Sequence, residues 1–423
     1  MNLLTANDRI GAYPPSFHAA VNTPLPPFLP LKGAIRADVC VVGAGYTGLS
    51  AARHLAERGF DVVVLEASRV GSGASGRNGG QVGSGQRLEQ DALEAMVGPD
   101  DARRLWDMGE EAKALVRDLA GRMGLAFHPG IAHACRTAAE VDHARHMADH
   151  LARRYAYDQV QPMDAGQMAD LIGTDRYKGG DLDHGAGHID PLAFALGLAR
   201  TCPARIHERS RVTRIDGTTV HTEEGHVQAD HVILACNGYL GDLEPQVAAR
   251  VMPINNFIVA TEPLDPAPLS RPVAVADTKF VVNYWRLSDD NRLLFGGGES
   301  YGYRFPKDIA ATVRAPLAEV YPHLRDVRID YAWGGTLAIT MNRMPCFRQV
   351  APNVLSASGY SGHGVAMATL AGRVLAEAVA GQAERFDLLA RLPQPRFPGG
   401  VTLRAPLLAL AMTWYAMRDR LGI

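Results

Sequence analysis

Residues 43–48 read Gly43-Ala44-Gly45-Tyr46-Thr47-Gly48, which is the pattern G-x-G-x-x-G. The apolar, β-branched residues 37–42 before it predict a buried strand, and residues 46–58 after it predict a helix that ends at Gly59. Between a strand and a helix, the glycines of this pattern allow a tight turn, a close approach of backbone to a pyrophosphate, and close packing of helix on strand. The anion would lie at the helix N-terminus. The stretch therefore predicts a dinucleotide-binding β-α-β unit with a parallel sheet.

A carboxylate follows the next predicted strand. Residues 61–65 read D-V-V-V-L and predict a second buried strand, and Glu66 stands eighteen residues after Gly48. At the end of the second strand of such a unit, a carboxylate accepts hydrogen bonds from the ribose hydroxyls of the adenosine. We therefore expect Glu66, with Ala67 beside it, to bind the adenosine half of the dinucleotide. A carboxylate there disfavours a ribose 2′-phosphate.

The dinucleotide could be NAD or FAD, and the segment that follows Glu66 bears on the choice. Residues 70–81 read V-G-S-G-A-S-G-R-N-G-G-Q, with polar donors between the glycines. Such a segment can lie flat against a ligand and offer backbone N–H groups to it. The candidate cofactor-binding residues here are Ser75, Gly76, Arg77, Asn78, Gly79, Gly80 and Gln81.

A second glycine-rich loop lies near the end of the chain. Residues 359–364 read G-Y-S-G-H-G and precede a predicted helix over 365–380. The free N–H groups and the positive end of that helix would favour negative charge on whatever binds there. If a flavin lies there, the loop would stabilise the charge that the flavin gains on reduction. The candidates are Gly359, Ser361, Gly362, His363 and Gly364.

Composition limits the class of protein. The 423 residues suit two folding units, and a net charge of −2 lacks the basic excess of nucleic-acid-binding proteins. The five cysteines are scattered and form no C-x-x-C pair, which favours a reducing cytoplasm and predicts neither a disulfide framework nor a metal site. No signal peptide is visible. The longest apolar run, 405–417, is too short to span a bilayer and predicts a docked amphipathic helix instead.

Other patterns predict the remaining elements. A proline-rich leader over 14–30 should run extended, and 100–150 reads as helical. Within it, His143, His146 and His150 share a helix face, but the charges between them predict a solvated face and no metal. Residues 212–238 alternate like antiparallel strands, and 190–202 begin a helix. A hairpin over 281–297 would lie in a second sheet.

Together these motifs resemble the D-amino-acid-oxidase-type family of FAD-dependent oxidoreductases. The tail, with Pro398-Gly399-Gly400, Arg404 and Trp414-Tyr415, resembles its γ-glutamylputrescine oxidoreductase branch. The resemblance implies an α/β fold: a Rossmann-type, glutathione-reductase-like FAD domain and a second α+β substrate domain on a large, mostly antiparallel sheet. The FAD domain would comprise residues 1–100, 186–250 and 331–423, and the substrate domain residues 101–185 and 251–330.

The resemblance also implies further site residues. Additional FAD contacts would come from Val212, Ala235, Asn237, Gly238, Gly334 and Gly335. The substrate pocket would contain Tyr284, Trp285, Arg286, His188 and Trp333, with His363 near the substrate. Some relatives link FAD to a cysteine just before the late loop, but residues 336–342 contain none, so we expect noncovalent FAD.

The implied reaction is oxidation of a primary or secondary amine C–N bond to an imine, which water then splits. The amine must first lose a proton, and His363 could accept it. Ala366 stands where relatives carry a lysine for a substrate carboxylate, which disfavours a small N-methyl amino acid. We expect a γ-glutamylated polyamine or a similar N-substituted amine. Two alternatives stay open: a D-amino-acid or N-alkyl-amino-acid dehydrogenase with a quinone acceptor, and a non-catalytic flavin-binding subunit. Residues 295–306 contain no lysine, so the acceptor, oxygen or quinone, stays open too.

Overall fold

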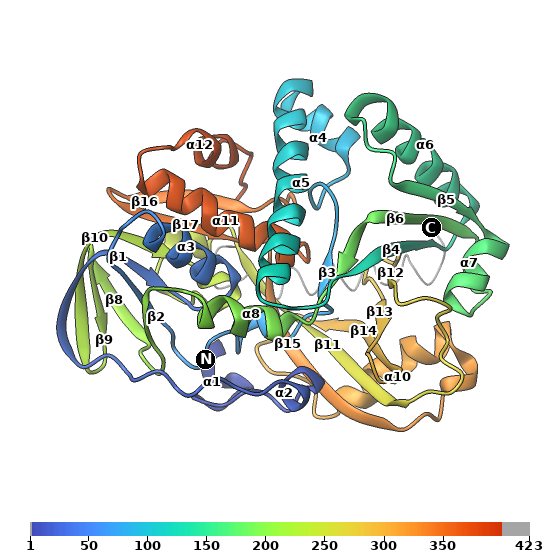
Figure 1. The fold of residues 1–423 in the computed structure, drawn as a ribbon, viewed down its shortest axis with the longest axis horizontal. Coiled ribbons are helices and arrows are strands. Elements are labelled where there is room, and N and C mark those ends of the chain that lie inside the picture. The colour runs from blue at the N-terminus through green and yellow to red at the C-terminus, as the bar shows by residue number, and fades with distance from the viewer. Residues whose placement is uncertain (1, 400–423) are drawn as a thin grey trace.

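The structure, a computed structural model, describes residues 2–399. Two sheets lie side by side, each covered by helices (Figure 1). The helix expected over 405–417 and the tail residues from 400 onward lie outside the described residues.

The first sheet has eight strands within the described part of the chain, in the order β16-β17-β10-β1-β2-β7, with β8 and β9 paired beside β10. The strands from β17 to β7 run parallel, as the β-α-β motif predicts. The strands are β1 (Gly33–Val42), β2 (Val62–Leu65), β7 (Arg205–His207), β8 (Val212–Asp216), β9 (Thr219–Thr222), β10 (Gly225–Leu234), β16 (Cys346–Ala351) and β17 (Val354–Ser358).

The central strand β1 is buried on both faces, which explains its continuous apolar sequence. Val39 and Val41 join the core formed with helices α3, α5, α8 and α11. Cys40 and Val42 alternate to the opposite face, which the β8–β9 hairpin covers. The sheet is therefore the middle layer of three.

The second sheet has nine strands in the described residues, in the order β15-β11-β14-β13-β12-β4-β6-β3, with β5 beside β6. It is mostly antiparallel, with one parallel pair, β4 and β12, as expected. The strands are β3 (Gln81–Val82), β4 (His128–Cys135), β5 (Val160–Asp164), β6 (Gly179–His188), β11 (Met252–Pro263), β12 (Ala274–Asp277), β13 (Tyr284–Leu287), β14 (Arg292–Ser300) and β15 (Ile329–Ile339).

Helices cover both sheets. In Figure 1, α3 and α11 lie together over the first sheet, and α10 lies against the second. The helices are α1 (Leu3–Ala6), α2 (Phe17–Val21), α3 (Tyr46–Ala56), α4 (Gln90–Val97), α5 (Pro99–Arg122), α6 (Ala138–Tyr155), α7 (Ala165–Ile172), α8 (Pro191–Arg200), α9 (Pro245–Ala248), α10 (Ile309–Val320), α11 (Gly364–Val379) and α12 (Glu384–Ala390); the 3₁₀ turns are η1 (Ala74–Gly76), η2 (Asn237–Tyr239) and η3 (Pro322–Leu324).

Two expectations are wrong in detail. The region 100–150 is not helical throughout, because β4 separates α5 from α6 and pairs with β6 and β12. The proline-rich leader is not wholly extended either. The short helix α2 forms within it, and the Ser16 hydroxyl caps this helix by accepting a hydrogen bond from the Ala19 N–H.

The division into a cofactor domain and a substrate domain stays a prediction, and the two sheets depart from it at two places. Strand β15, which we assigned almost entirely to the first unit, pairs with β11 in the second sheet. Helix α5, which we assigned to the second unit, packs against α11 and joins the core of the first sheet. In both cases tertiary pairing decides, and local sequence carries no signal of it.

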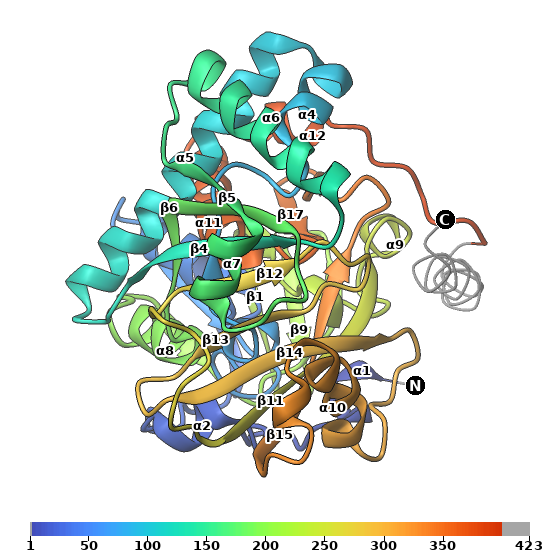
Figure 2. The ribbon, with the colours of Figure 1, turned by 90° about the vertical axis from the view of Figure 1, so that its right-hand side faces the viewer.

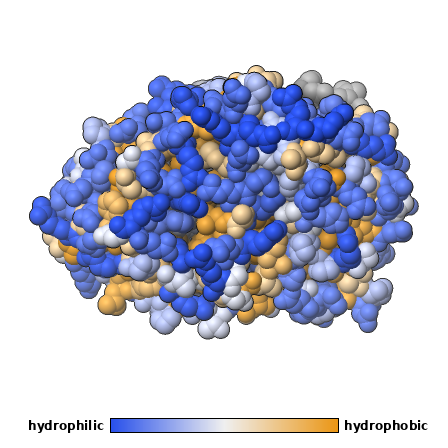
Figure 3. Space-filling view, turned by 45° about the horizontal axis from the view of Figure 1, so that its top comes forward, coloured by the Kyte–Doolittle hydropathy of each residue, from blue (hydrophilic) through white to orange (hydrophobic). Residues whose placement is uncertain are grey.

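The surface in Figure 3 is mostly hydrophilic, with hydrophobic residues interspersed. Within residues 2–399, no helix is both long and apolar enough to cross a membrane.

Candidate cofactor and substrate site

The parallel strands place four loops at one edge of the first sheet. Val42 pairs with both Leu65 and Leu234, so β1, β2 and β10 end at the same level; Leu234 pairs with Ser356, and β17 continues two residues further, to Ser358. The loops that follow begin at Gly43, Glu66, Ala235 and Gly359. In open parallel sheets ligands bind at the carboxyl ends of the strands.

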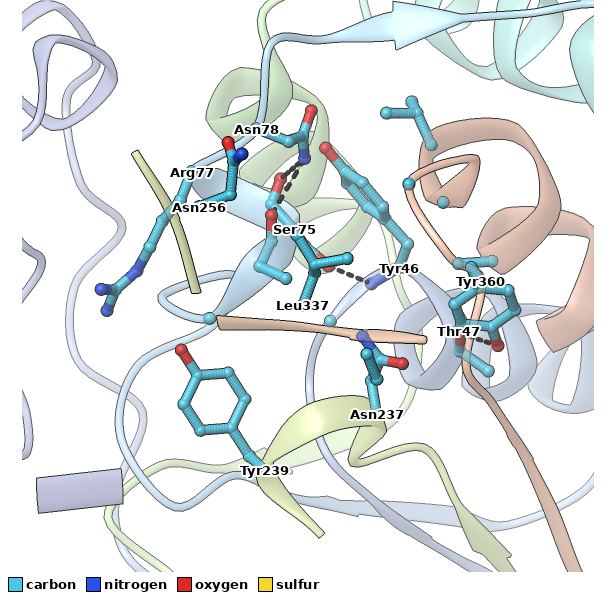
Figure 4. A pocket seen from close by; sticks show the side chains of 18 of the residues that line it. Tyr46, Thr47, Ser75, Arg77, Asn78, Asn237, Tyr239, Asn256, Leu337 and Tyr360 are labelled. Carbon is cyan, nitrogen blue, oxygen red and sulfur yellow. Dashed lines mark hydrogen bonds between the residues drawn. The ribbon is translucent and has the colours of Figure 1, made fainter. Parts of the chain in front are cut away.

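A cavity of about 520 Å³ lies at this edge, and residues from both sheets line it (Figure 4). The first sheet contributes the loops after its strands. The second sheet contributes side chains from one face, among them Asn256 on β11, Tyr284 on β13 and Leu337 on β15. A volume of this size is typical of small-molecule and cofactor pockets.

The first glycine loop has the geometry that the motif predicts. Gly43 has φ +107°, and a Cβ there would lie 2.7 Å from the Ala235 carbonyl oxygen. A Cβ on Gly48 would lie 1.8 Å from the carbonyl oxygen of Gly43, so helix α3 can pack this closely only on glycine. The Ser75 hydroxyl accepts a hydrogen bond from the Tyr46 N–H at 3.0 Å, in the first turn of the helix.

Glu66 lies directly beneath that loop. Its carboxylate accepts hydrogen bonds from the N–H groups of Ala44 and Ser68, both at 2.8 Å. Burial raises the pKa of Glu66 above its ordinary value, and these two hydrogen bonds offset only part of that rise. Each carboxylate oxygen retains lone pairs, which hydroxyl groups of a ligand can use. Glu66 also lines the cavity, as a residue that binds a ribose must.

We expected the polar side chains of the glycine-rich segment to bind the cofactor, but two of them donate hydrogen bonds to carbonyl groups of the protein itself. The Arg77 guanidinium donates to the Ser72 and Gly334 carbonyl oxygens and pairs with Asp8. The Asn78 amide donates to the Ala74 and Ser75 carbonyls (Figure 4). These side chains therefore hold the shape of the segment, although both residues also line the cavity.

Two of the predicted pocket residues act on this segment from outside the cavity. The Trp333 indole N–H donates to the Arg77 carbonyl at 2.9 Å, and the Arg286 Nε donates to the Gly79 carbonyl at 2.8 Å. Both side chains are buried. We therefore assign Trp333 and Arg286 to positioning the segment, which corrects our expectation that they contact the substrate.

Two other predicted pocket residues lie elsewhere. Trp285 alternates to the far face of β13 and stacks on Phe295 in the core of the second sheet. His188 stacks on His128, and its Nε2 hydrogen-bonds to the Pro272 carbonyl. Neither lines the cavity; on β13 the pleat of the sheet turns Trp285 to the face opposite Tyr284, which does line it.

The glycine-rich loop at residues 359–364 contacts the first glycine-rich loop, at residues 43–48, directly. The hydroxyls of Thr47 and Tyr360 are 2.7 Å apart and hydrogen-bonded (Figure 4). The Gly359 N–H donates to the Asn237 side chain at 2.9 Å, so the loop after β10 joins the same contact. Helix α11, which follows, has no side-chain cap among the described residues, and its first residue, Gly364, lines the cavity.

His363 is the N-cap residue of α11 and lines the cavity. Its Nε2 is shielded from solvent and has no hydrogen-bond partner within the described residues. Burial and, after it, the positive charge of Arg87 lower the pKa of His363 to about 4. The imidazole is therefore neutral at neutral pH and can accept a proton.

Further charged residues line the cavity that no sequence motif had indicated, among them Asp8, Arg87, His133, Asp277, Glu299 and Arg343. Within residues 2–399 neither arginine forms an ion pair at 4.0 Å or less. Burial, then the charge of Arg343, lowers the pKa of Arg87. Burial opposes protonation of His133, but Asp181, 2.7 Å away, raises its pKa to about 9. No sequence motif marks these residues, because loops and strands far apart in the chain bring them together.

The predicted residues thus separate into two groups. The following line the cavity: Gly43, Gly45, Tyr46, Thr47, Glu66, Ala67, Ser75, Arg77, Asn78, Gly79, Gln81, Val212, Ala235, Asn237, Tyr284, Ser361, Gly362, His363 and Gly364. The remaining predicted cofactor-binding residues are glycines that do not line the cavity and pack against neighbouring atoms: Gly48, Gly76, Gly80, Gly238, Gly334, Gly335 and Gly359.

Sites for a metal are not evident. His143 hydrogen-bonds to Glu89, and His150 hydrogen-bonds to Glu94. In the part of the chain that the structure describes, no three potential ligands gather around one point.

The lining fits a dinucleotide. Bare backbone at Gly43 and Gly45, the N-terminus of α3 and the Glu66 carboxylate occur together at the positions that pyrophosphate and ribose require. A Cβ on Gly45 would lie 2.9 Å from the Ser75 hydroxyl, so a side chain would close this end of the cavity.

Comparison with known proteins gives the same assignment. Residues 38–378 match the family model described as FAD dependent oxidoreductase. The chain is 43% identical over 424 residues to gamma-glutamylputrescine oxidoreductase of Escherichia coli, covering 96% of this chain and 99% of that one. It is 42% identical over 419 residues to the probable oxidoreductase OrdL of Rhizobium meliloti, covering 96% and 97%.

Among solved structures, glycine oxidase from Geobacillus kaustophilus has a similar fold. The TM-score is 0.70 at 21% identity, covering 85% of this chain and 99% of that one. The family match, which extends from β1 to α11, contains both the early and the late loops of the cavity. The chain belongs to the family of FAD-dependent oxidoreductases.

Proposed function

We propose that this protein oxidises the C–N bond of an amine, with a γ-glutamylated polyamine or a similar N-substituted amine as substrate. The observation that carries the proposal is that one cavity joins the dinucleotide-binding loops to the neutral His363 imidazole. The 43% identity to the E. coli gamma-glutamylputrescine oxidoreductase supports the substrate class.

His363 has the properties of the proton acceptor that the reaction needs. FAD, when bound, would supply the oxidant for the C–N bond. A substrate ammonium cannot give up a hydride until it has lost a proton, because the nitrogen lone pair drives the step. His363 Nε2 is neutral and has no hydrogen-bond partner among the described residues, so its lone pair is available to the substrate nitrogen; because its pKa is about 4, it is a weak base and takes this proton only in passing. Water then hydrolyses the imine to an aldehyde and an amine or ammonia.

The charged residues of the cavity suit the second end of the substrate. A γ-glutamyl group carries a carboxylate and an ammonium. Arg87 and Arg343 can hold the carboxylate, and Glu299 can hold the ammonium. The three charges interact: burial raises the pKa of Glu299, and both arginines lower it.

We infer that FAD is held without a covalent bond. Of the five cysteines, all within the described residues, only Cys236 lines the cavity. Burial, and then the charge of Glu66, raises the pKa of Cys236 to about 12, so its thiol stays protonated. Acid precipitation should therefore release all of the FAD into the supernatant.

The electron acceptor and the compartment complete the proposal. Either oxygen or a quinone takes the electrons, and release of hydrogen peroxide during turnover distinguishes the two. All five thiols are unpaired, which supports the cytoplasm as the compartment.

Turnover of a panel of amines tests the substrate. We expect aldehyde formation from γ-glutamylputrescine and a higher KM for putrescine, which lacks the carboxylate. Arg343→Met should raise the KM for γ-glutamylputrescine by about tenfold or more, the usual loss for a charge-assisted contact, and leave that for putrescine unchanged. Arg145→Met, at an exposed ion pair on α6, is the control. Turnover of D-amino or N-alkyl amino acids alone would favour the dehydrogenase alternative. FAD binding without turnover of any amine would favour a flavin-binding subunit.

A further inference from the structure

The segment before the first sheet lies across the edge of the cofactor cavity. In Figures 1 and 2, α2 lies beside β11 and β15 of the second sheet. Phe17 joins Ile258, Leu294 and Trp333 in one apolar cluster there. The His18 ring meets the Trp333 indole edge to face, with centroids 5.5 Å apart.

The same segment is bound to the loops of the first sheet. The Gly11 N–H donates to the Ser68 hydroxyl at 3.0 Å, and the Tyr13 hydroxyl donates to the Val70 carbonyl at 2.9 Å. His18 Nε2 lies 3.2 Å from the Asn78 carbonyl. Residues 11–18 thus contact the adenosine loop and the glycine-rich segment, and they join both to the second sheet.

Two residues of the segment line the cavity itself, Leu4 and Asp8. The Asp8 carboxylate lies 2.9 Å from the Arg77 guanidinium, whose side chain is only 4% exposed. Among the described residues, Asp8 is the one carboxylate in an ion pair with Arg77. Removing one partner of a buried pair leaves the other charge uncompensated, and such losses act mainly on dissociation rates.

We propose that residues 4–18 are part of the FAD site, and that the Asp8–Arg77 pair closes this segment over the bound cofactor. The segment lies outside the region 38–378 that matches the family model, so nothing in that match assigns it a role. On this proposal, FAD leaves the cavity past residues 4–18, which contacts hold to both sheets. By the same linkage, bound FAD stabilises the closed segment.

The test measures release of FAD from the holoenzyme. Asp8→Asn keeps the size of the side chain and removes its charge, and we expect FAD to dissociate about tenfold faster, as for other buried charge pairs. The control is Asp142→Asn, which removes an exposed ion pair with Arg145 at a similar distance of 3.2 Å. Release from Asp8→Asn at the wild-type rate would overturn the proposal.

A second variant and a second measurement cover the case in which Asp8→Asn does not fold. Leu4→Ala removes a lining side chain without touching the ion pair, and it should also release FAD faster than wild type. In limited proteolysis of the wild-type protein, FAD should slow cleavage within residues 4–18 at least several-fold. Equal cleavage with and without FAD would contradict the proposal. Neither readout depends on the amine substrate, so failure of the proposed function would leave this test intact.

Discussion

Thr47 and Tyr360 are 313 positions apart in the sequence, yet their hydroxyl oxygens lie 2.7 Å apart in a buried hydrogen bond. Thr47 belongs to the first turn of α3, and Tyr360 belongs to the loop before α11. The bond therefore joins the two glycine-rich loops of the chain at the cavity. A Cβ on Gly372 would lie 2.4 Å from the Thr47 carbonyl oxygen, so α11 and α3 also pack closely.

A double-mutant cycle should show that this hydrogen bond couples the two loops. Thr47→Val or Tyr360→Phe alone leaves a buried hydroxyl without its partner and should cost about 1–3 kcal/mol of unfolding free energy. The double variant should cost less than the sum, with a coupling of about 0.5–1.5 kcal/mol. Urea unfolding of the holoenzyme measures all four proteins. Strict additivity would mean that the two loops are held together by other contacts.

Gly48 tests the packing of α3 beneath the first loop. Gly48→Ala would place a Cβ 1.8 Å from the Gly43 carbonyl oxygen, so the loop must move and FAD binding should be lost or strongly weakened. Gly121, in helix α5, is the matched control, because a Cβ added there would meet no atom within 4 Å. Gly121→Ala should bind FAD normally and gain up to about 1 kcal/mol of stability. Fluorescence titration with FAD distinguishes the two.

Glu66 should contribute directly to FAD affinity. Glu66→Gln replaces one carboxylate oxygen by an amide NH₂ group, which cannot accept a hydrogen bond. FAD binding should weaken by about 1–3 kcal/mol, because a buried donor that was paired with that oxygen loses its partner. Glu57→Gln, at an exposed i,i+4 pair with Arg53, should leave affinity unchanged. Equilibrium dialysis gives both constants. Wild-type affinity of Glu66→Gln would remove this residue from the ribose site.

His363 should limit the rate of anaerobic flavin reduction. His363→Asn cannot accept a proton, and general-base catalysis contributes about 100- to 10,000-fold, so reduction by an amine should slow markedly. Stopped-flow absorbance measures the rate, and FAD affinity is measured alongside. An unchanged reduction rate would make His363 a structural residue.

His363 should also affect stability at acid pH. Its pKa is about 4 in the folded protein against an ordinary value of 6.5, so the unfolded chain binds the extra proton more readily. The stabilisation is present above pH 6.5 and is lost as the pH falls from about 6.5 to about 4. Relative to wild type, His363→Asn should lose less stability across that window, as measured by denaturant unfolding at several pH values. Parallel pH profiles would contradict the assignment.

Much of the cofactor site could be predicted because it lies in short motifs. The turn at Gly43–Gly48, the carboxylate of Glu66 and the loop at 359–364 each combine residue type with a strand or helix boundary, and the parallel sheet brings them together. The start of helix α8 could also be predicted. The position of Asp190 before Pro191 predicts an N-cap, and its carboxylate accepts a hydrogen bond from the Ala193 N–H.

The substrate end could not be predicted in the same way. On β13 only Tyr284 lines the cavity, while Trp285 faces the core, because side chains alternate along a strand. The sequence alone does not say which of the two faces of the strand is turned toward the cavity. Arg87 and Arg343 come from loops 256 positions apart. Asp8 precedes the motif that defines the family and has no pattern of its own.

Whether this protein oxidises an amine with FAD is decided by anaerobic mixing of the purified, FAD-loaded protein with γ-glutamylputrescine while the visible flavin absorption is recorded. We expect this absorption to disappear in a single reductive phase, with one equivalent of aldehyde formed per FAD. A flavin absorption that persists with every amine, or a colourless protein that takes up no FAD, would contradict this expectation.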